Sequence, residues 1–299
     1  AFSANAGGVA TVIGTPPNSV LIGLLESEYN TQISFLKWMT MGLPFSIMMV
    51  SLCYLVLVKI MFPCNNIKFS TSANVISDEL KNLGKISKQE KRVLTIFAIT
   101  VSLWITRTLI NYIFPGLQLS DTIISLIGAI SLFAIPMNFK KGDFVLHWND
   151  TSRLAWGILL LFGGGLALAK GMASSGLVAV ITEGIKSGGF SPIIVVCLLI
   201  VLMLFMTELM SNVALIAVLA PVVAGIAIGL NIPILNVLIP VTMASSCAFM
   251  LPMATPPNAI VFASGYVKVS EMARAGIILN VLAVGLLILY YLFVIPIIF

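Results

Sequence analysis

The chain of 299 residues is 59% hydrophobic and only 9% charged, with a mean hydropathy of +1.10 and a formal net charge of +5. Soluble globular domains are far more polar, so this composition excludes a soluble fold. Because apolar runs of about 20 residues, the length that crosses a bilayer, recur along the chain, we predict an all-α polytopic protein embedded in the lipid bilayer.

Six apolar runs near that length are predicted to be membrane helices. Two further regions, residues 1–24 and 191–230, are also apolar but are interrupted by helix breakers or polar residues. The six predicted helices cover residues 36–62, 93–113, 120–136, 154–175, 234–251 and 272–298.

The first interruption is the motif Thr-Pro-Pro-Asn at residues 15–18. Two adjacent prolines forbid a regular helix, because each lacks an N–H and the second forces the first out of the α region. The same motif recurs at residues 255–258, again inside an apolar run. We therefore predict two stretches of backbone that are unwound within the membrane.

Basic residues concentrate in the polar loop 63–92, with smaller groups around Lys140 and around Lys268. Cytoplasmic loops are enriched in Lys and Arg, so we predict that loop 63–92 is cytoplasmic and that the protein lies in the plasma membrane. The loop has one aromatic residue and is flanked by membrane helices, so nucleic acid is not an expected partner. The loops left on the outer side are 25–35, 114–119 and 176–190.

This topology makes residues 191–230 begin and end on the outer side. The apolar pieces 192–206 and 213–229 are each short for a full span, and they meet at the polar segment 207–212. We predict a re-entrant hairpin whose tip reaches the middle of the membrane, where irregular backbone must be buried in protein or line a watery cavity. The alternative is two ordinary helices joined by a polar kink.

The repeated motif indicates an internal repeat. Aligning the two copies places Asn18 on Asn258, and each copy precedes a polar loop and a long closing helix. In the predicted topology the first copy runs outward and the second inward. Many secondary transporters build their substrate site from such inverted repeats, with helices broken near the midplane.

Residues at these breaks suit an anion carried with a cation. Free N–H groups at half-helix N-termini supply partial positive charge, and Ser211, Asn212 and Thr255 supply hydroxyl and amide donors. Unwound backbone carbonyls are good ligands for sodium. Ser and Asn are also common helix caps, so a purely structural cap is the alternative for the tip.

Other conspicuous residues have competing explanations. Glu208 is predicted either to ligate a cation or to pair with a hydroxyl or backbone donor. Arg107 and Lys170 lie near helix ends, where snorkelling is expected, and the glycines at 163–165 fit close helix packing. With one histidine and neither an HExxH nor a GxSxG motif, the chain is not expected to be an enzyme.

Five segments together resemble the divalent anion:sodium symporter family, which includes di- and tricarboxylate carriers. The resemblance extends over essentially the whole chain. It implies that this is the C-terminal portion of such a protein, with the first repeat incomplete, and that these residues alone do not transport. The segments are GGVATVIGTPPN (7–18), LWITR (103–107), WGILLLFGGGLALA (156–169), TELMSNVAL (207–215) and MATPPNAIVFASG (253–265).

The resemblance also implies a mechanism and a domain organisation. In the family, a transport domain of hairpins and broken helices moves as an elevator against a scaffold that forms a homodimer. Carried over, residues 1–62 and 191–299 belong to the moving part and residues 93–190 to the scaffold. Residues 63–92 form the cytoplasmic loop between them.

The resemblance assigns the site residues as well. Na⁺ is expected at Thr207, Met210, Asn212 and Ala254, with a second ion at Gly14. A small di- or tricarboxylate anion is expected to contact Ser211, Asn212, Val213, Thr255 and Pro256.

The expected function is sodium-coupled uptake of a small di- or tricarboxylate. The family's Ser-Asn-Thr tip reads Ser-Asn-Val here, so Val213 lacks a hydroxyl, which leaves dicarboxylate, tricarboxylate and sulfate open. Sodium-independent dicarboxylate exchange is a further alternative. It is disfavoured because residues 191–265 contain no Lys, Arg or His to balance the substrate charge.

Overall fold

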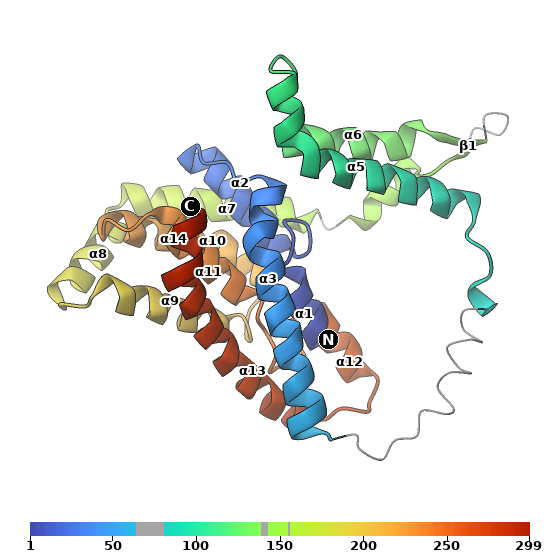
Figure 1. The fold of residues 1–299 in the computed structure, drawn as a ribbon. Helices are drawn as coiled ribbons and strands as arrows, with labels where there is room; N and C mark the ends of the chain where they lie inside the picture. The colour runs from blue at the N-terminus through green and yellow to red at the C-terminus, as the bar shows by residue number, and fades with distance from the viewer. Residues whose placement is uncertain (64–80, 139–142, 155) are drawn as a thin grey trace. The chain divides into compact units, whose positions relative to one another are not determined.

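The structure is a computed structural model that describes residues 1–63, 81–138, 143–154 and 156–299 (Figure 1). Within these residues the chain is helical except for turns and one short antiparallel pair of strands, β1 (Pro136–Asn138) and β2 (Asp143–Phe144). The contacts divide the chain into two units. The first comprises Ala1–Ile33, Lys37–Pro63 and Trp156–Phe299, and the second comprises Ser34–Leu36 and Cys64–Ala155.

The first unit holds most of the helices. Its N-terminal members are α1 (Phe2–Gly8), α2 (Pro16–Tyr29) and α3 (Phe35–Tyr54), which continues as the π-helix η1 (Leu55–Met61). After the second unit follow α7 (Gly157–Ser174), α8 (Leu177–Ser187), α9 (Pro192–Met206) and α10 (Asn212–Gly229). The last are α11 (Ile234–Ser245), α12 (Pro256–Ala263), α13 (Val269–Leu289), η3 (Tyr290–Val294) and α14 (Ile295–Ile298).

Four helices in the described part of the chain are long and apolar enough to cross a membrane. The bent pair formed by α7 and α8 makes a fifth if it is counted as one span. The all-α polytopic class is therefore confirmed, and the chain is an integral membrane protein. The four are Phe35–Met61, Lys88–Ile113, Asn212–Gly229 and Val269–Ile298.

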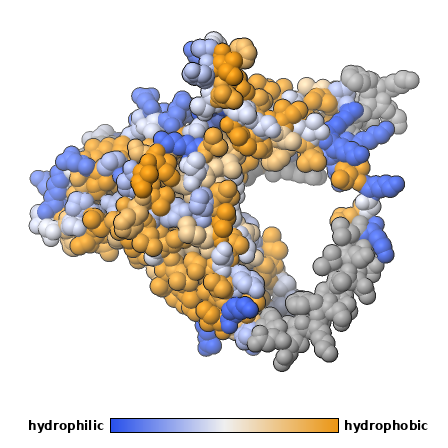
Figure 2. Space-filling view, in the orientation of Figure 1, coloured by the Kyte–Doolittle hydropathy of each residue, from blue (hydrophilic) through white to orange (hydrophobic). Residues whose placement is uncertain are grey.

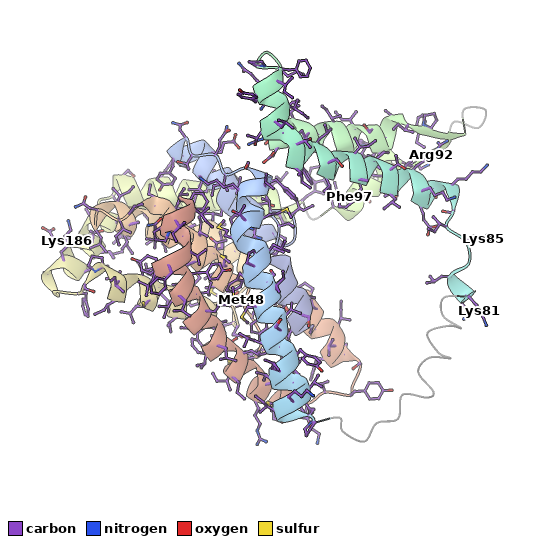
Figure 3. All side chains as sticks on the ribbon, viewed as in Figure 1. Met48, Lys81, Lys85, Arg92, Phe97 and Lys186 are labelled. Atoms are coloured by element: carbon purple, nitrogen blue, oxygen red, sulfur yellow. The ribbon has the colours of Figure 1, made fainter. Side chains whose placement is uncertain are left out.

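The outer faces of α3 and α13 match this assignment. Both helices expose large apolar side chains, among them Ile47, Met48, Val281 and Leu289. Figure 2 shows hydrophobic side chains over much of the visible surface of these helices, and Figure 3 labels Met48 on α3. Such side chains are stable only against lipid or another apolar surface.

Two predicted helices differ from the structure. The run 120–136 forms only the 14-residue helix α6 (Asp121–Ala134). The prediction of a helix over 234–251 is wrong, because α11 ends at Ser245. The residues that follow are apolar, but their amide groups are engaged by a buried carboxylate from another helix, as described below, so they are unavailable to a helical ladder.

The region 176–190 also differs from the predicted loop. Most of it forms the helix α8, which packs against α7 and α10 inside the first unit. Residues 156–190 therefore share a compact unit with the predicted hairpin, whereas the sequence groups them with 93–155. The boundary between a moving and a fixed part stays a prediction.

The glycine run at 163–165 serves helix packing at one of its three positions. A methyl group added at Gly165 would overlap the carbonyl oxygen of Ala217 in α10, whereas one added at Gly163 or Gly164 would meet nothing within 4 Å. The absence of a side chain at Gly165 thus permits α7 and α10 to approach closely.

Gly165→Ala is expected to destabilise the protein by about 1–3 kcal/mol, because the added methyl forces the two helices apart. Gly163→Ala and Gly164→Ala are the matched controls. They should be neutral or slightly stabilising, since alanine favours a helix by up to about 1 kcal/mol over glycine. Thermal unfolding of the purified variants in detergent measures the difference, and equal melting temperatures for all three would contradict the close contact.

The second unit is built on α5 (Lys88–Ile113) and α6, with the 3-10 helix η2 (Trp148–Arg153). The helix α5 begins with a capping box. Ser87 N donates to Glu90 Oε2 at 2.7 Å, and Glu90 N donates to Ser87 Oγ at 3.1 Å. The helix α5 thus includes residues 88–92, which the sequence assigned to the polar loop.

Two charged residues for which snorkelling was expected lie near acidic side chains. Arg107 Nη1 lies 3.3 Å from Asp121 Oδ1, and Lys170 Nζ lies 3.6 Å from Glu28 Oε1.

Of the predicted cytoplasmic loop 63–92, residues 64–80 lie outside the described residues, as do Lys140 and Lys141. Lys81, Lys85 and Arg92 lie before α5 and in its first turns (Figure 3).

Candidate functional site

The two Thr-Pro-Pro-Asn motifs adopt the same local structure. Thr15 and Thr255 are extended, with φ/ψ of −147°/139° and −145°/152°, and each is the N-cap of a helix that begins with the two prolines. Proline suits these first positions because the N–H that it lacks has no partner there anyway. Both motifs therefore end an unwound segment and start a new helix, as predicted.

The asparagine of each motif fastens the unwound segment before it. Asn18 Nδ2 donates to the carbonyls of Gly8 (3.3 Å) and Thr11 (2.9 Å), ten and seven residues upstream. Asn258 Nδ2 donates to Ala248 O and Leu251 O, both at 3.1 Å and at the same two spacings. The bonds that the two asparagine NH2 groups donate are thus equivalent, which supports the internal repeat. Their orientation across a membrane stays a prediction.

Both breaks and residues 209–213 line one cavity of about 490 Å³ in the first unit. Every residue that the sequence predicted for the site lies at this place. Thr207 is bonded to a lining residue, and the others are themselves in the wall. The predicted residues in the wall are Gly14, Met210, Ser211, Asn212, Val213, Ala254, Thr255 and Pro256.

Three helices begin at the wall of this cavity, and their N-cap side chains are not used for capping. Thr15, Ser211 and Thr255 make no capping bond to the backbone of α2, α10 or α12 in the described structure. A cap hydroxyl ordinarily accepts from the second or third amide of its helix. These three hydroxyls are therefore available to a ligand, which disfavours the purely structural explanation of the tip.

The α10 end of the cavity offers backbone donors. The first helical hydrogen bond of α10 runs from Leu215 N to Ser211 O at 2.9 Å, so the preceding amides of Asn212 and Val213 have no helical partner. These N–H groups, together with the positive end of the helix dipole, suit a negatively charged ligand.

Thr207 forms a cluster of oxygen atoms behind the tip. Its buried hydroxyl lies 2.7 Å from Asn212 Oδ1 and 2.6 Å from the carbonyl oxygen of Ser245. A hydroxyl has one proton and can donate to only one of two acceptors at a time. Oxygen-rich sites of this kind suit a hard cation such as sodium.

Glu208 has a role that the sequence left open. Its buried carboxylate accepts hydrogen bonds from Phe249 N (2.8 Å), Met250 N (2.9 and 3.1 Å) and Leu251 N (3.0 Å). Asn280 Nδ2 in α13 donates to the same carboxylate at 2.8 Å. The second alternative given for Glu208 is the one observed, because its charge is satisfied by backbone and amide donors.

The sequence reasoning missed three polar residues of the site. Asn5 in α1 and Ser246 line the cavity, and Asn280 holds Glu208 from α13. Ser246 is buried and its hydroxyl has no hydrogen-bond partner among the described residues. A signal was present for Asn5 and Asn280, since each is an amide side chain in an otherwise apolar run.

The wall of the cavity contains no charged side chain among the residues that the structure describes. In the same described ranges, no group of three or more His, Cys, Asp or Glu residues is arranged to hold a metal ion. Any cation bound here therefore meets hydroxyl, amide and backbone oxygens. Any anion bound here meets N–H and O–H donors.

Comparisons with known proteins relate the chain to membrane transporters. A family model described as the transmembrane region of sodium:sulfate symporters matches residues 1–298. A protein of Staphylococcus saprophyticus named sodium-dependent dicarboxylate transporter SdcS is 36% identical over 299 residues, which cover 99% of this chain and 57% of that protein. A Staphylococcus aureus protein of the same name is 37% identical over 300 residues, covering 99% and 58%. The chain thus spans somewhat more than half the length of these relatives.

Proposed function

Because the chain belongs to the sodium:sulfate symporter family, the divalent anion:sodium symporters, we propose that the protein takes up small di- or tricarboxylate anions together with Na⁺. The observation that carries the proposal is the cavity at which residues 209–213 and both Thr-Pro-Pro-Asn breaks meet. The staphylococcal relatives, whose names specify sodium and dicarboxylate, favour a dicarboxylate as the substrate.

In this proposal the anion lies against the start of α10. The hydroxyl groups of Ser211 and Thr255 donate hydrogen bonds to it, as do the backbone N–H groups of Asn212 and Val213. Pro256 packs beside it. Donors held in place before binding lower the cost of orienting them, so the anion gains affinity without a fixed cation.

Sodium supplies the opposing charge in this proposal. One ion is held by Thr207, Met210, Asn212 and Ala254, near the oxygen cluster around the Thr207 hydroxyl. A second lies at the first break, where Gly14 approaches the Gly8 carbonyl so closely that a side chain at Gly14 would overlap it. Binding each ligand then favours the other, because the cation reduces the cost of placing an anion in a neutral cavity.

The elevator motion, the homodimer and a cytoplasmic loop 63–92 belong to the same proposal. Residues 1–62 and 191–299 would move, and residues 93–190 would form the dimeric scaffold. A cytoplasmic position for the loop agrees with its Lys and Arg content and with a plasma-membrane location.

Two other substrates or couplings remain candidates. Sulfate is consistent with the family description and with the loss of one hydroxyl at Val213. Sodium-independent exchange needs a fixed positive charge beside the substrate, and the described wall of the cavity offers none.

Uptake into vesicles distinguishes these candidates. The protein, expressed from its complete gene and reconstituted, should accumulate labelled succinate when an inward Na⁺ gradient is imposed, and not with an equal K⁺ gradient. Accumulation of sulfate in preference to succinate would reassign the substrate. Counter-anion exchange without Na⁺ would reject sodium coupling.

A further inference from the structure

Asn5 connects α1 to the second break. Its Nδ2 atom lies 2.8 Å from the carbonyl oxygen of Ala248, 2.9 Å from Thr255 Oγ1 and 3.2 Å from Asn258 Oδ1. The side chain is 8% exposed and lines the cavity. Asn5 thus contacts both polar residues of the second Thr-Pro-Pro-Asn motif, Thr255 and Asn258, although Thr255 lies 250 positions further along the chain.

The direction of each hydrogen bond in this network follows from the acceptors. The carbonyl oxygens of Ala248 and Leu251 can only accept, so the NH2 group of Asn258 must face them and its Oδ1 must face Asn5. The group of Asn5 that faces Ala248 O and Asn258 Oδ1 must likewise be its NH2. Both amide orientations are therefore fixed by chemistry.

Thr255 Oγ1 lies 2.9 Å from the same NH2 group, so it accepts a hydrogen bond from Asn5. The two N–H groups of Asn5 are shared among three acceptors, of which Asn258 Oδ1 at 3.2 Å is the most distant. The proton of the Thr255 hydroxyl must then point elsewhere. Thr255 donates no hydrogen bond to any residue that the structure describes, and it lines the cavity. The remaining direction for its O–H is the interior of the cavity, where it can donate to a bound anion.

We propose that Asn5 is a positioning residue for the substrate: it holds the Thr255 hydroxyl as a donor aimed at a carboxylate oxygen of the bound anion. Accepting from Asn5 also polarises the hydroxyl and strengthens the bond that it donates. This inference rests on the proposed function, because it assumes that the cavity binds a carboxylate.

The first break lacks this arrangement. Thr15 makes no side-chain hydrogen bond within the described residues, so its hydroxyl is free to rotate. Asn18 Oδ1, the counterpart of Asn258 Oδ1, is buried without a partner there. Asn5 therefore makes the two breaks functionally unequal, and Thr255 rather than Thr15 becomes the oriented donor.

A double-mutant cycle tests the proposal on the protein expressed from its complete gene. Asn5→Ala and Thr255→Val should each weaken succinate binding about tenfold, as expected for loss of a hydrogen bond to a charged group. The double variant should bind no more weakly than Thr255→Val alone, because Asn5 acts through the Thr255 hydroxyl. Sodium affinity measured without succinate should change less than about twofold in Asn5→Ala.

A structural role for Asn5 predicts a different pattern. Its loss would then weaken sodium and succinate equally, and the effects of the two substitutions would multiply, which would overturn the proposal. Thr255→Ser keeps the hydroxyl and should bind succinate nearly normally. Ser46→Ala is the matched control, because Ser46 Oγ donates to the neighbouring α1 carbonyl of Ala6 at 2.7 Å but does not line the cavity.

Two further outcomes are separable. If Asn5→Ala does not fold, the uncharged variant Asn5→Ser replaces it, because a carboxylate would repel both the anion and the oxygen atoms of Ala248 and Asn258. A serine side chain is shorter and places no N–H at Thr255 Oγ1, so succinate binding should again weaken about tenfold; unchanged binding would overturn the proposal. If the unmodified protein binds no succinate with Na⁺ present, the proposed function fails instead. Normal binding with independent effects in the cycle rejects only the role of Asn5.

Discussion

Glu208→Gln is expected to cause the largest loss of stability of any conservative substitution near the site. It should also weaken the binding of both sodium and the anion. Two carboxylate oxygens now accept from three consecutive amides, Phe249 to Leu251. A glutamine has one acceptor oxygen, and its NH2 group would face a backbone N–H instead. Each buried donor left unpaired costs about 1–3 kcal/mol, and the charge-assisted bonds that remain are weakened as well.

The cost falls on the segment that forms the site. Residues 246–255 connect α11 to α12 and carry Ala254 and Thr255. If the amides of 249–251 are released, this segment loses its attachment to Glu208 and so to the 207–211 turn. We therefore expect a melting temperature several degrees lower, together with sodium and succinate affinities reduced by at least tenfold.

Thermal unfolding in detergent and sodium-titrated succinate binding measure these effects. Glu183→Gln removes the same charge from an exposed position in α8 and should alter neither quantity. An unchanged melting temperature in Glu208→Gln would show that the unwound segment keeps its shape without the carboxylate. The description of Glu208 as its anchor would then be wrong.

The sequence was sufficient where the cause of a structure is local. Two adjacent prolines cannot continue a helix from the residues before them, so both breaks were predictable. The polar segment 207–212 separated α9 from α10 for a similar reason. Because these local features all lie in one cavity, the residues named from sequence and from family resemblance came together in the structure.

The sequence was insufficient where the cause is distant. The end of α11 at Ser245 was missed because the residues that follow Ser246, Cys-Ala-Phe-Met-Leu, are as apolar as the helix. Their unwinding depends on Glu208, which lies about 40 residues upstream and meets them only in the folded chain. Asn5 is a similar case, since its partners lie about 250 residues away.

The interpretation of α8 failed for a different reason. Its 11 residues are too few to read as a span, and its polar residues suggested a loop. A short amphipathic helix is stabilised by the surface on which it packs, here α7 and α10, and not by its own propensity. No property of residues 176–190 alone identifies that surface.

Asn212→Ala is expected to weaken sodium and anion binding together, each by roughly 10- to 150-fold, the range for loss of a hydrogen bond to a charged ligand. The reason is that one side chain serves two ligands. Asn212 Oδ1 belongs to the oxygen cluster 2.7 Å from the Thr207 hydroxyl, and the same residue lines the cavity at the start of α10. No other predicted site residue combines the two positions in this way.

Neighbouring substitutions separate the two roles of the tip. Ser211→Ala removes a hydroxyl that makes no capping bond to described backbone, so it should weaken the anion and leave sodium nearly unchanged. Val213→Thr keeps the side-chain volume and adds a hydroxyl at the cavity, so it should alter the ranking of succinate, citrate and sulfate more than the sodium dependence. Sodium-titrated binding of all three anions to the three variants is the measurement. If Asn212→Ala binds both ligands normally, the tip only begins a helix, and coupling between sodium and anion must arise at the first break, around Gly14, instead.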